Sequence, residues 1–284
     1  DNDTWVLENA TQSGTNWVLL APIGTRPAAR NQHSLVYDAV NNRMILFGGS
    51  SPLQNDAWVL TNANGLGGTP EWIQLTPSGG APPARMGHAA HYDAATNRMI
   101  VFGGYTAGGP VNDVWLLSNA NGLSGTPQWN QVSPAGTAPI GRLDFPNAYD
   151  AGSNRLIVFR GSDCCSNTLP PDLWILKNAN GNGGTPEWVQ MALSTSEAPL
   201  AGKMSFAYDP GSKRLMLFGG NPGVNYGGVA VNEYWVLSNA DGTTGVPRWT
   251  QVTAPSPPAP RQENVVAYRR ATDRLVMLYG VGSQ

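Results

Sequence analysis

Short runs of apolar residues, separated by polar turns, recur along the whole chain. One period contains four such runs, which we name A to D. In the second copy they are His88–Tyr92 (A), Arg98–Phe102 (B), Val114–Leu117 (C) and Trp129–Val132 (D). The runs are rich in β-branched and aromatic residues and are bounded by Gly, Pro, Asn and Asp, which is typical of strands. No stretch keeps a helical period, so we expect strands and almost no helix.

Two recurring signatures show that this pattern is an internal repeat. Each A–B pair reads Tyr-Asp, a turn, an Arg, an apolar run and Gly-Gly, and each C–D pair carries two Trp residues. The five copies use all ten Trp of the chain: Trp5/Trp17, Trp58/Trp72, Trp115/Trp129, Trp174/Trp188 and Trp235/Trp249. Four antiparallel strands repeated about every 55 residues describe the blade of a β-propeller.

The two ends of the chain carry complementary halves of one copy. Residues 1–20 contain C and D runs, and residues 262–280 contain A and B runs. The sequence therefore predicts one all-β domain over residues 1–284, a five-bladed β-propeller of four-stranded antiparallel blades. One blade would be completed by the N-terminal C and D strands and the C-terminal A and B strands, which removes open sheet edges. The halves of different copies could instead join head to tail into a filament, although the short connectors favour closure within one chain.

The repeat resembles the kelch repeat. The resemblance rests on the Arg and His before strand A (Arg85 and His88), on the apolar strand B that ends in Gly103-Gly104, and on the two spaced Trp residues. It extends over essentially the whole chain and implies a propeller. It leaves the function open, because kelch-like propellers include protein-binding modules, sugar-handling enzymes and cell-surface parts.

Three positions depart from the repeat. Ala201 stands where an Arg precedes strand A in the other copies. Arg160 and Tyr279 stand where the other copies have the first Gly after strand B. The third to fifth copies therefore match the kelch pattern less closely than the first two.

Charged residues recur at equivalent positions, which favours structural roles for them. An acid lies two residues before the first Trp in every copy: Asp3, Asp56, Asp113, Asp172 and Glu233. An Arg precedes strand A in four copies: Arg30, Arg85, Arg142 and Arg261. The D–A and B–C connections emerge at the same end of a propeller, so we predict ion pairs between these two sets. At the other end, we predict pairs between the Asp after the strand A Tyr and the Arg that begins strand B.

The connections at one end vary in length, and this end is the candidate binding surface. The four complete B–C loops contain 6, 8, 10 and 12 residues between the Gly pair and the acid, whereas the C–D turns are nearly constant. Variable loops on a rigid scaffold commonly carry binding. The candidate ligand-binding residues are Arg30, Arg85, Arg142, Arg261, Tyr105, Tyr226, Cys164 and Cys165. The alternatives are ion pairs for the arginines, loop packing for the tyrosines, and a structural or unpaired role for the adjacent cysteines, which could also form a vicinal disulfide.

The sequence contains no convincing catalytic constellation. Three His residues spread over two copies make a weak case for a metal, and no Ser-His-Asp elbow is present. The acids outside the repeat lie mostly on C–D turns or at the chain ends, so a pair suited to a glycosidase is also missing. We expect no catalytic residue, no metal and no cofactor.

Composition narrows the possible partners and suggests a location. Charged residues make up 13% of the chain and the net charge is −2, so the chain lacks the basic field that nucleic acids require. No window approaches roughly 18 apolar residues, so we expect no membrane insertion. The N-terminus shows no signal peptide, which is either absent or removed. Low charge with abundant Gly, Pro, Asn and Thr suggests an extracellular or cell-surface protein.

Three functions are compatible with these observations. We expect an exported, non-enzymatic kelch-like propeller that binds a glycan or a protein through its B–C/D–A end. The second hypothesis is a structural subunit that self-associates into an extracellular fibre or surface layer. The third is a carbohydrate-active enzyme, an oxidase, lyase or hydrolase, at the same end.

Overall fold

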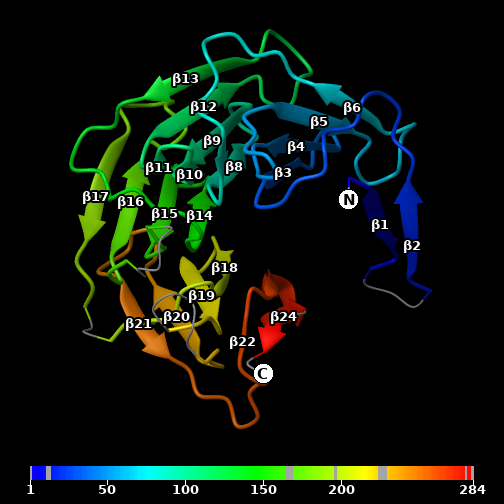
Figure 1. The fold of residues 1–284 in the computed structure, drawn as a ribbon. Helices are drawn as coiled ribbons and strands as arrows, with labels where there is room; N and C mark the ends of the chain where they lie inside the picture. Colours follow the sequence, from blue (N-terminus) through cyan, green and yellow to red (C-terminus); the bar gives the residue numbers. More distant parts are fainter. Residues whose placement is uncertain are drawn as a thin grey trace. The chain divides into compact units, whose positions relative to one another are not determined.

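A computed structural model of the chain consists of antiparallel strands joined by short connections (Figure 1). The structure describes residues 2–10, 14–163, 169–194, 197–222, 229–278 and 280–282. Within these ranges there is one short 3-10 helix, η2 (Arg270–Thr272), and no α-helix. Internal contacts divide the chain into two compact units, each with its own sheets and core.

The first unit comprises residues 1–102, 106–108 and 114–131, and it contains a hairpin and two four-stranded sheets. The hairpin consists of β1 (Thr4–Glu8) and β2 (Asn16–Leu20). Blade I consists of β3 (Ser34–Asp38), β4 (Arg43–Phe47), β5 (Ala57–Thr61) and β6 (Glu71–Gln74). Blade II consists of β8 (Ala89–Asp93), β9 (Arg98–Phe102), β12 (Val114–Ser118) and β13 (Gln128–Val132).

The second unit comprises residues 103–105, 109–113 and 132–284, and it also contains two four-stranded sheets. Blade III consists of β14 (Asn147–Asp150), β15 (Arg155–Phe159), β16 (Leu173–Lys177) and β17 (Glu187–Met191). Blade IV consists of β18 (Ser205–Asp209), β19 (Arg214–Phe218), β20 (Tyr234–Ser238) and β21 (Arg248–Gln251). A hairpin follows, formed by β23 (Val265–Arg269) and β24 (Arg274–Leu278). Two-residue strands lie in the connections: β7 (Arg85–Met86), β10 (Tyr105–Thr106), β11 (Gly109–Pro110), β22 (Arg261–Gln262) and β25 (Val281–Gly282).

The strands confirm the predicted fold class, an all-β chain of four-stranded antiparallel blades. Runs A to D form the four strands of each blade, from A to D in spatial order. The hairpins β1–β2 and β23–β24 are the predicted C–D and A–B halves of the divided copy, and each forms a two-stranded sheet. The joining of these halves into one blade, and the single domain over residues 1–284, stay predictions.

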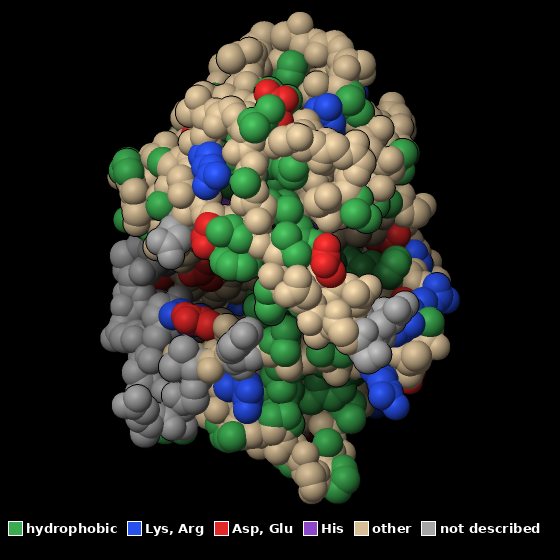
Figure 2. Space-filling model, turned by 90° about the vertical axis from the view of Figure 1, so that its right-hand side faces the viewer, with side chains coloured by type: hydrophobic (Ala, Val, Ile, Leu, Met, Phe, Trp, Pro, Cys, Tyr) green, Lys and Arg blue, Asp and Glu red, His purple; other side chains and the backbone are tan. Residues whose placement is uncertain are grey.

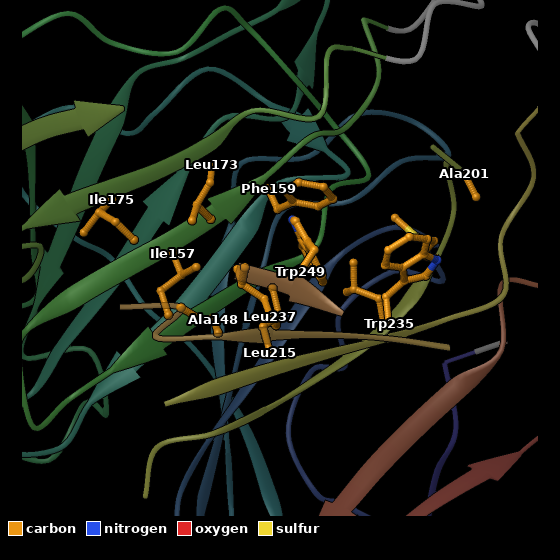
Figure 3. Close-up of a cluster of buried hydrophobic side chains, with 13 residues drawn as sticks. Ala148, Ile157, Phe159, Leu173, Ile175, Ala201, Leu215, Trp235, Leu237 and Trp249 are labelled. Carbon is orange, nitrogen blue, oxygen red and sulfur yellow. The ribbon is translucent and has the colours of Figure 1, made fainter. Parts of the chain in front are cut away.

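In blades II and IV the second Trp packs on the preceding blade of the same unit, which favours its retention there. In the first unit the ring of Trp129, on β13, lies 4.9 Å from that of Phe47, on β4. In the second unit Trp249, on β21, lies 4.8 Å from Phe159, on β15. Figure 3 shows this second cluster, in which the strands of blades III and IV bury a shared apolar layer. Within each unit, the second blade therefore completes the core of the first.

The connection after each D strand also bonds to the D strand of the next blade. Ser78 accepts a hydrogen bond from the backbone N–H of Trp129 at 2.9 Å and donates its own to Pro127 at 2.9 Å. The next residue, Gly79, has a φ of +82°, and a Cβ there would overlap the carbonyl oxygen of Trp129. Glycine is needed at this position both for its backbone conformation and for the close approach.

Candidate functional site

Within each unit, the B–C and D–A connections of neighbouring repeats meet, and we call the surface that they form in that unit its loop end. It consists of residues 21–33, 48–56 and 76–88 in the first unit, and of residues 103–105, 109–113, 133–146, 160–172, 192–204, 219–233 and 252–264 in the second, as far as these are described. In the first unit Gly49 donates to the carbonyl of Arg85 at 2.9 Å, and Arg85 donates to that of Gln54 at 3.0 Å. The second unit repeats these bonds twice. Gly104 donates to the carbonyl of Arg142, which donates to that of Val111, and Gly220 donates to the carbonyl of Arg261, which donates to that of Val231. The predicted meeting of the two connections is thus observed.

The Arg before strand A pairs with the acid before strand C in blades I and III, as predicted. Arg30 binds both carboxylate oxygens of Asp56, at 2.5 and 3.0 Å. Arg142 binds both oxygens of Asp172, each at 3.0 Å. The side chain of Arg142 is fully buried, and that of Arg30 is 3% exposed. These planar, bidentate pairs fix the D–A connection against the B–C loop of the same blade.

The acid also holds the first Trp of its copy. The indole N–H of Trp58 donates to Asp56 at 2.7 Å, and that of Trp174 donates to Asp172 at 2.6 Å. Side chains two residues apart lie on the same face of a strand, which explains the constant spacing of acid and Trp. Burial raises the pKa of Asp56, but the hydrogen bonds from Arg30 and Trp58 outweigh burial and leave that pKa below its ordinary value. Arg, acid and Trp thus form one unit, which we call the Arg–acid–Trp unit.

The other two candidate arginines are also bound to the scaffold. Arg85 is fully buried and donates its Nε–H to the carbonyl of Pro83 at 3.1 Å. Arg261 is half-buried and donates its Nε–H to Ala259 at 3.1 Å. A ligand would have to compete with these internal partners for the guanidinium groups. Ligand binding by the four arginines stays a prediction.

The remaining candidates are only partly placed. Tyr105 lies on β10 in the B–C loop of blade II and is half-buried. Tyr226, Cys164 and Cys165 lie outside the described residues. The structure therefore brings the candidate arginines and Tyr105 to the loop end but joins none of them into a shared site among the described residues.

The His residue of the repeat packs beneath the Gly-Gly pair. A Cβ on Gly48 would lie 3.0 Å from the ring of His88, and one on Gly49 would lie 2.9 Å from the Cβ of His33. Burial, reinforced by the positive charge of Arg85, lowers the pKa of His88 to about 3, so the ring is neutral. Its Nε2 lies 2.9 Å from the Ser34 hydroxyl. These contacts support the packing role that the repeat position suggests.

The described residues give no indication of a metal site or of a membrane-spanning helix. Among them, no group of three or more His, Cys, Asp or Glu side chains is arranged to hold a metal ion. No helix in the described part of the chain is long and apolar enough to cross a membrane. On the face drawn in Figure 2, Lys and Arg side chains are interspersed with acidic, apolar and uncharged groups.

In blades I and III, the pairing predicted for the opposite end is wrong. We call this end, formed by the A–B and C–D turns, the turn end. Asp38 accepts the backbone N–H of Val40 at 3.2 Å, in its own turn, and bonds from Tyr92 at 3.2 Å and Asn121 at 2.9 Å, both in blade II. Arg43 donates to the carbonyl of Asn121 at 2.9 Å. The acid and the Arg therefore both bond to the next blade.

The second unit repeats this arrangement with different residues. Asp150 accepts the hydroxyl of Tyr208 at 2.7 Å, and Arg155 donates to the carbonyl of Asp241 at 2.7 Å. Lys213 pairs with Asp150 and lies 3.5 Å from Asp241. The turn end is thus a series of bonds between blades within each unit.

Blade IV lacks one member of the Arg–acid–Trp unit. Trp235 donates to Glu233 at 2.8 Å, as the first Trp does in blades I and III, but the Arg position is Ala201. A cavity of about 410 Å³ lies beside these three residues. Ala201 is visible in the sequence as a departure from the repeat, and the predicted pairing of the two positions relates it to Glu233, but the sequence does not show the cavity beside them. The signal that could have revealed the link is an acid that persists where its Arg is lost.

Comparison with known proteins identifies the repeat. Residues 1–145 match the family model described as the KLHDC2/KLHL20/DRC7 Kelch-repeats domain. The chain is 31% identical over 169 residues to the leucine-zipper-like transcriptional regulator 1 homolog of Drosophila melanogaster, covering 57% of this chain and 16% of that protein. It is 32% identical over 140 residues to dynein regulatory complex subunit 7 of Chlamydomonas reinhardtii, covering 46% and 11%. It is 25% identical over 244 residues to kelch domain-containing protein 2 of Bos taurus, covering 77% and 55%.

These comparisons overturn the predicted extracellular or cell-surface location. The relatives carry the names of intracellular proteins, such as a transcriptional regulator homolog and a subunit of the dynein regulatory complex. The prediction rested on low charge and abundant Gly, Pro, Asn and Thr. In this chain those features follow from short strands and tight turns, which any propeller of this type requires.

The assignment to a family rests on more than half of the chain. The matched region of residues 1–145 includes the N-terminal hairpin and blades I and II. The alignments cover between 11% and 55% of the relatives' own lengths, so those relatives contain further sequence of their own. The repeat signatures, the four-stranded antiparallel blades and the family model agree, and the chain belongs to the kelch-repeat family.

Proposed function

We propose that this chain is a non-catalytic protein-interaction module that binds a partner protein through its loop end. Membership of the kelch-repeat family supports this proposal, because its relatives include a protein named as a subunit of a larger complex. Binding by such a module depends on surface side chains held by a rigid scaffold, and the Arg–acid–Trp units supply that rigidity.

The observation that carries the proposal is a set of exposed apolar side chains on the loop end of the second unit. Ile140 and Leu200, in the D–A connections before blades III and IV, are 56% and 60% exposed. Val229, in the B–C loop of blade IV, is 68% exposed. Apolar side chains held in the open by anchored connections are typical of the centre of a protein interface.

The charged groups of the loop end support binding rather than acid–base chemistry. The carboxylates of Asp56 and Asp172 each hold an Arg and a Trp side chain. A carboxylate engaged in this way has its lone pairs occupied and is poorly placed to move a proton. Carbohydrate chemistry on these groups would require dismantling the scaffold.

Affinity capture with matched variants tests the proposal. The tagged chain, Ile140→Asp, Val229→Asp and the control Val246→Asp would be used to recover proteins from a cell extract, followed by quantitative mass spectrometry. Val246 is 57% exposed but lies on the C–D turn of blade IV, at the turn end. We expect one protein to be recovered by the wild type and by Val246→Asp, and to fall at least ~10-fold with the two loop-end variants.

The captured protein must then bind in purified form. Calorimetry with the purified partner should give a saturable dissociation constant for the wild type and Val246→Asp, weakened by Ile140→Asp. Equal recovery and equal affinity for all variants would contradict binding through the loop end.

A further inference from the structure

Blade IV contains the acid and the Trp of an Arg–acid–Trp unit without the Arg. In blade III, the side chain of Arg142 is fully buried between Asp172 and the carbonyl oxygens of Ile140 and Arg160. In blade IV, Glu233 still accepts the indole N–H of Trp235 at 2.8 Å. Glu233 and Trp235 therefore contact each other as Asp172 and Trp174 do, but no Arg of the repeat pairs with Glu233.

The cavity of blade IV occupies the place of this Arg. It measures about 410 Å³ and lies entirely within the second unit. Its lining includes two acids, Glu197 and Glu233, and the apolar residues Leu200, Ala201, Val231 and Trp235. Figure 3 shows Ala201 and Trp235 at one side of the buried cluster to which both belong. The space that an Arg side chain fills in blades I and III is thus an open pocket, with apolar walls and two carboxylates, those of Glu197 and Glu233.

No described side chain of the second unit supplies the missing cation. Glu233 takes part in none of the ion pairs among the described residues. Residues 164–168, 195–196 and 223–228 include no Lys, Arg or His in the sequence.

Arg160 lies near this region but does not neutralise Glu233. Its guanidinium donates to the carbonyl of Pro199 at 3.3 Å. Burial lowers the pKa of Arg160 to about 10, against the opposing charge of Asp172. The carboxylate that acts on Arg160 is therefore that of blade III.

We propose that this cavity binds the side chain of an arginine from the partner protein. The guanidinium would pair with both oxygens of Glu233, as Arg142 pairs with Asp172, and the aliphatic part would lie along Leu200, Val231 and Trp235. Arginine suits the pocket better than lysine because its planar fork matches a carboxylate and its aliphatic part packs on apolar walls. The inference rests on the proposed function and names the chemistry of the partner at one point of the loop end.

A small probe tests the pocket without the unidentified partner. N-acetylarginine amide would be titrated into the isotopically labelled chain while the indole N–H resonance of Trp235 is followed by NMR. This N–H donates to Glu233, so occupation of the carboxylate should shift its signal. N-acetylcitrulline amide, the neutral isostere, and N-acetyllysine amide serve as ligand controls. We expect saturable shifts with the arginine probe and at least ~10-fold weaker binding of both controls.

Three variants connect any binding to the pocket. Ala201→Arg restores the Arg of the repeat and should fill the cavity, and Glu233→Gln removes the carboxylate that the guanidinium would bind. We expect both to lose the response to the arginine probe. Glu187→Gln is the control, because Glu187 is an exposed acid on β17, paired with Lys177, and it should respond like the wild type. If Ala201→Arg does not fold, Ala201→Leu fills the cavity without a charge and gives the same test.

The inference fails if the arginine probe gives no saturable shift of Trp235, if citrulline binds equally well, or if Ala201→Arg still binds. These outcomes are distinct from failure of the proposed function. Ile140 does not line the cavity, so loss of the partner by Ile140→Asp together with no binding of the probe would retain the interaction module and reject the arginine pocket.

Discussion

At the loop end, a single carboxylate accepts hydrogen bonds from two buried side chains, an Arg and a Trp. Asp172 accepts both terminal nitrogens of Arg142 and the indole N–H of Trp174. An Asp or Glu at this position therefore remains useful to its Trp even when the Arg is absent, as Glu233 is to Trp235. At the residue scale, this shared acceptor explains why the acid is more constant among the copies than the Arg.

Removing the Arg of this unit should destabilise the fold strongly. Arg142→Ala leaves the largely buried carboxylate of Asp172 without its cation, and we expect a loss of about 3 kcal/mol in the free energy of unfolding. Lys177→Ala is the control, because its pair with Glu187 is exposed and should contribute no more than about 0.5 kcal/mol. Urea unfolding of both variants measures the difference. Similar losses in both would contradict a structural role for the buried pair.

His88 should make stability depend on pH. Its pKa is lowered from 6.5 to about 3 in the folded chain, so between these values the unfolded chain binds the proton and the folded chain does not. Stability is therefore lost as the pH falls from 6.5 toward 3, by up to about 1.4 kcal/mol per pH unit.

The variant His88→Phe tests this dependence, because Phe145 occupies the equivalent position in blade III. The free energy of unfolding, measured between pH 4.5 and 7, should fall less steeply on acidification in His88→Phe than in the wild type. Parallel curves would show that the ring of His88 protonates in the folded chain.

Neighbouring blades within a unit are joined by the same few contacts each time. At the element scale, the D–A connection bonds to the next D strand, the second Trp packs on the preceding strand B, and the turn-end Asp accepts a Tyr from the next blade. Each strand therefore meets residues that are distant in the sequence. Where one residue of such a contact differs from the other copies, its partner differs as well, as Lys213 and Asp241 do in blade IV.

Two adjacent glycines separate the need for close approach from the need for a positive φ. In Gly79→Ala the Cβ would meet the carbonyl oxygen of Trp129, and we expect a loss of about 3 kcal/mol. Gly80 also has a positive φ, but a Cβ there would meet no atom within 4 Å, so Gly80→Ala should cost about 1 kcal/mol. Thermal or urea unfolding compares the two variants. Equal costs would mean that the connection moves away from Trp129 freely.

The turn end of blade IV has exchanged an amide pair for a charged pair. In blade II, Asn97 donates to Asn121 at 2.9 Å, and Asn121 donates to Asp38 in blade I. The equivalent residues in blade IV are Lys213 and Asp241, with Lys213 between Asp241 and Asp150. Lys213→Asn leaves two buried carboxylates without their cation and should cost about 3 kcal/mol.

The double variant tests whether the two residues changed as a pair. Adding Asp241→Asn to Lys213→Asn recreates the amide pair of the other blades, so we expect it to recover at least about 1 kcal/mol of the loss. The double-mutant cycle, measured by urea unfolding, gives this coupling energy. Additive effects would show that the exchange is coincidental.

The whole chain carries two half-copies, one at each end, and each forms a two-stranded hairpin. The sequence assigns these halves to one another, within one chain or between copies. Short connectors favour the first possibility, so we expect a monomer of 30.1 kDa whose mass, measured by light scattering, does not change over a hundredfold range of concentration. A mass that grows with concentration would favour head-to-tail joining and the filament hypothesis.

Local patterns were enough to predict the blades. Strand formation, tight turns and the constant spacing of acid and Trp depend on residues close together in the chain, so strands such as β9 could be predicted from the repeat. The Arg142–Asp172 pair followed from the propeller topology that the repeat implies, which brings the D–A and B–C connections to one end. The turn end could not be predicted in this way. The spacing of Asp38 and Arg43 fits a pair with each other as well as bonds to Asn121, and only the packing of blade II on blade I selects the second.

The pocket of blade IV likewise depends on how distant parts of the chain pack together. The repeat relates Ala201 and Glu233 only as positions that are expected to pair, and the fold is needed to show that both line one cavity beside Trp235. A linear sequence records which side chain is missing. Whether its place is filled by a neighbour or stays open depends on the atoms that surround it, which come from several strands at once.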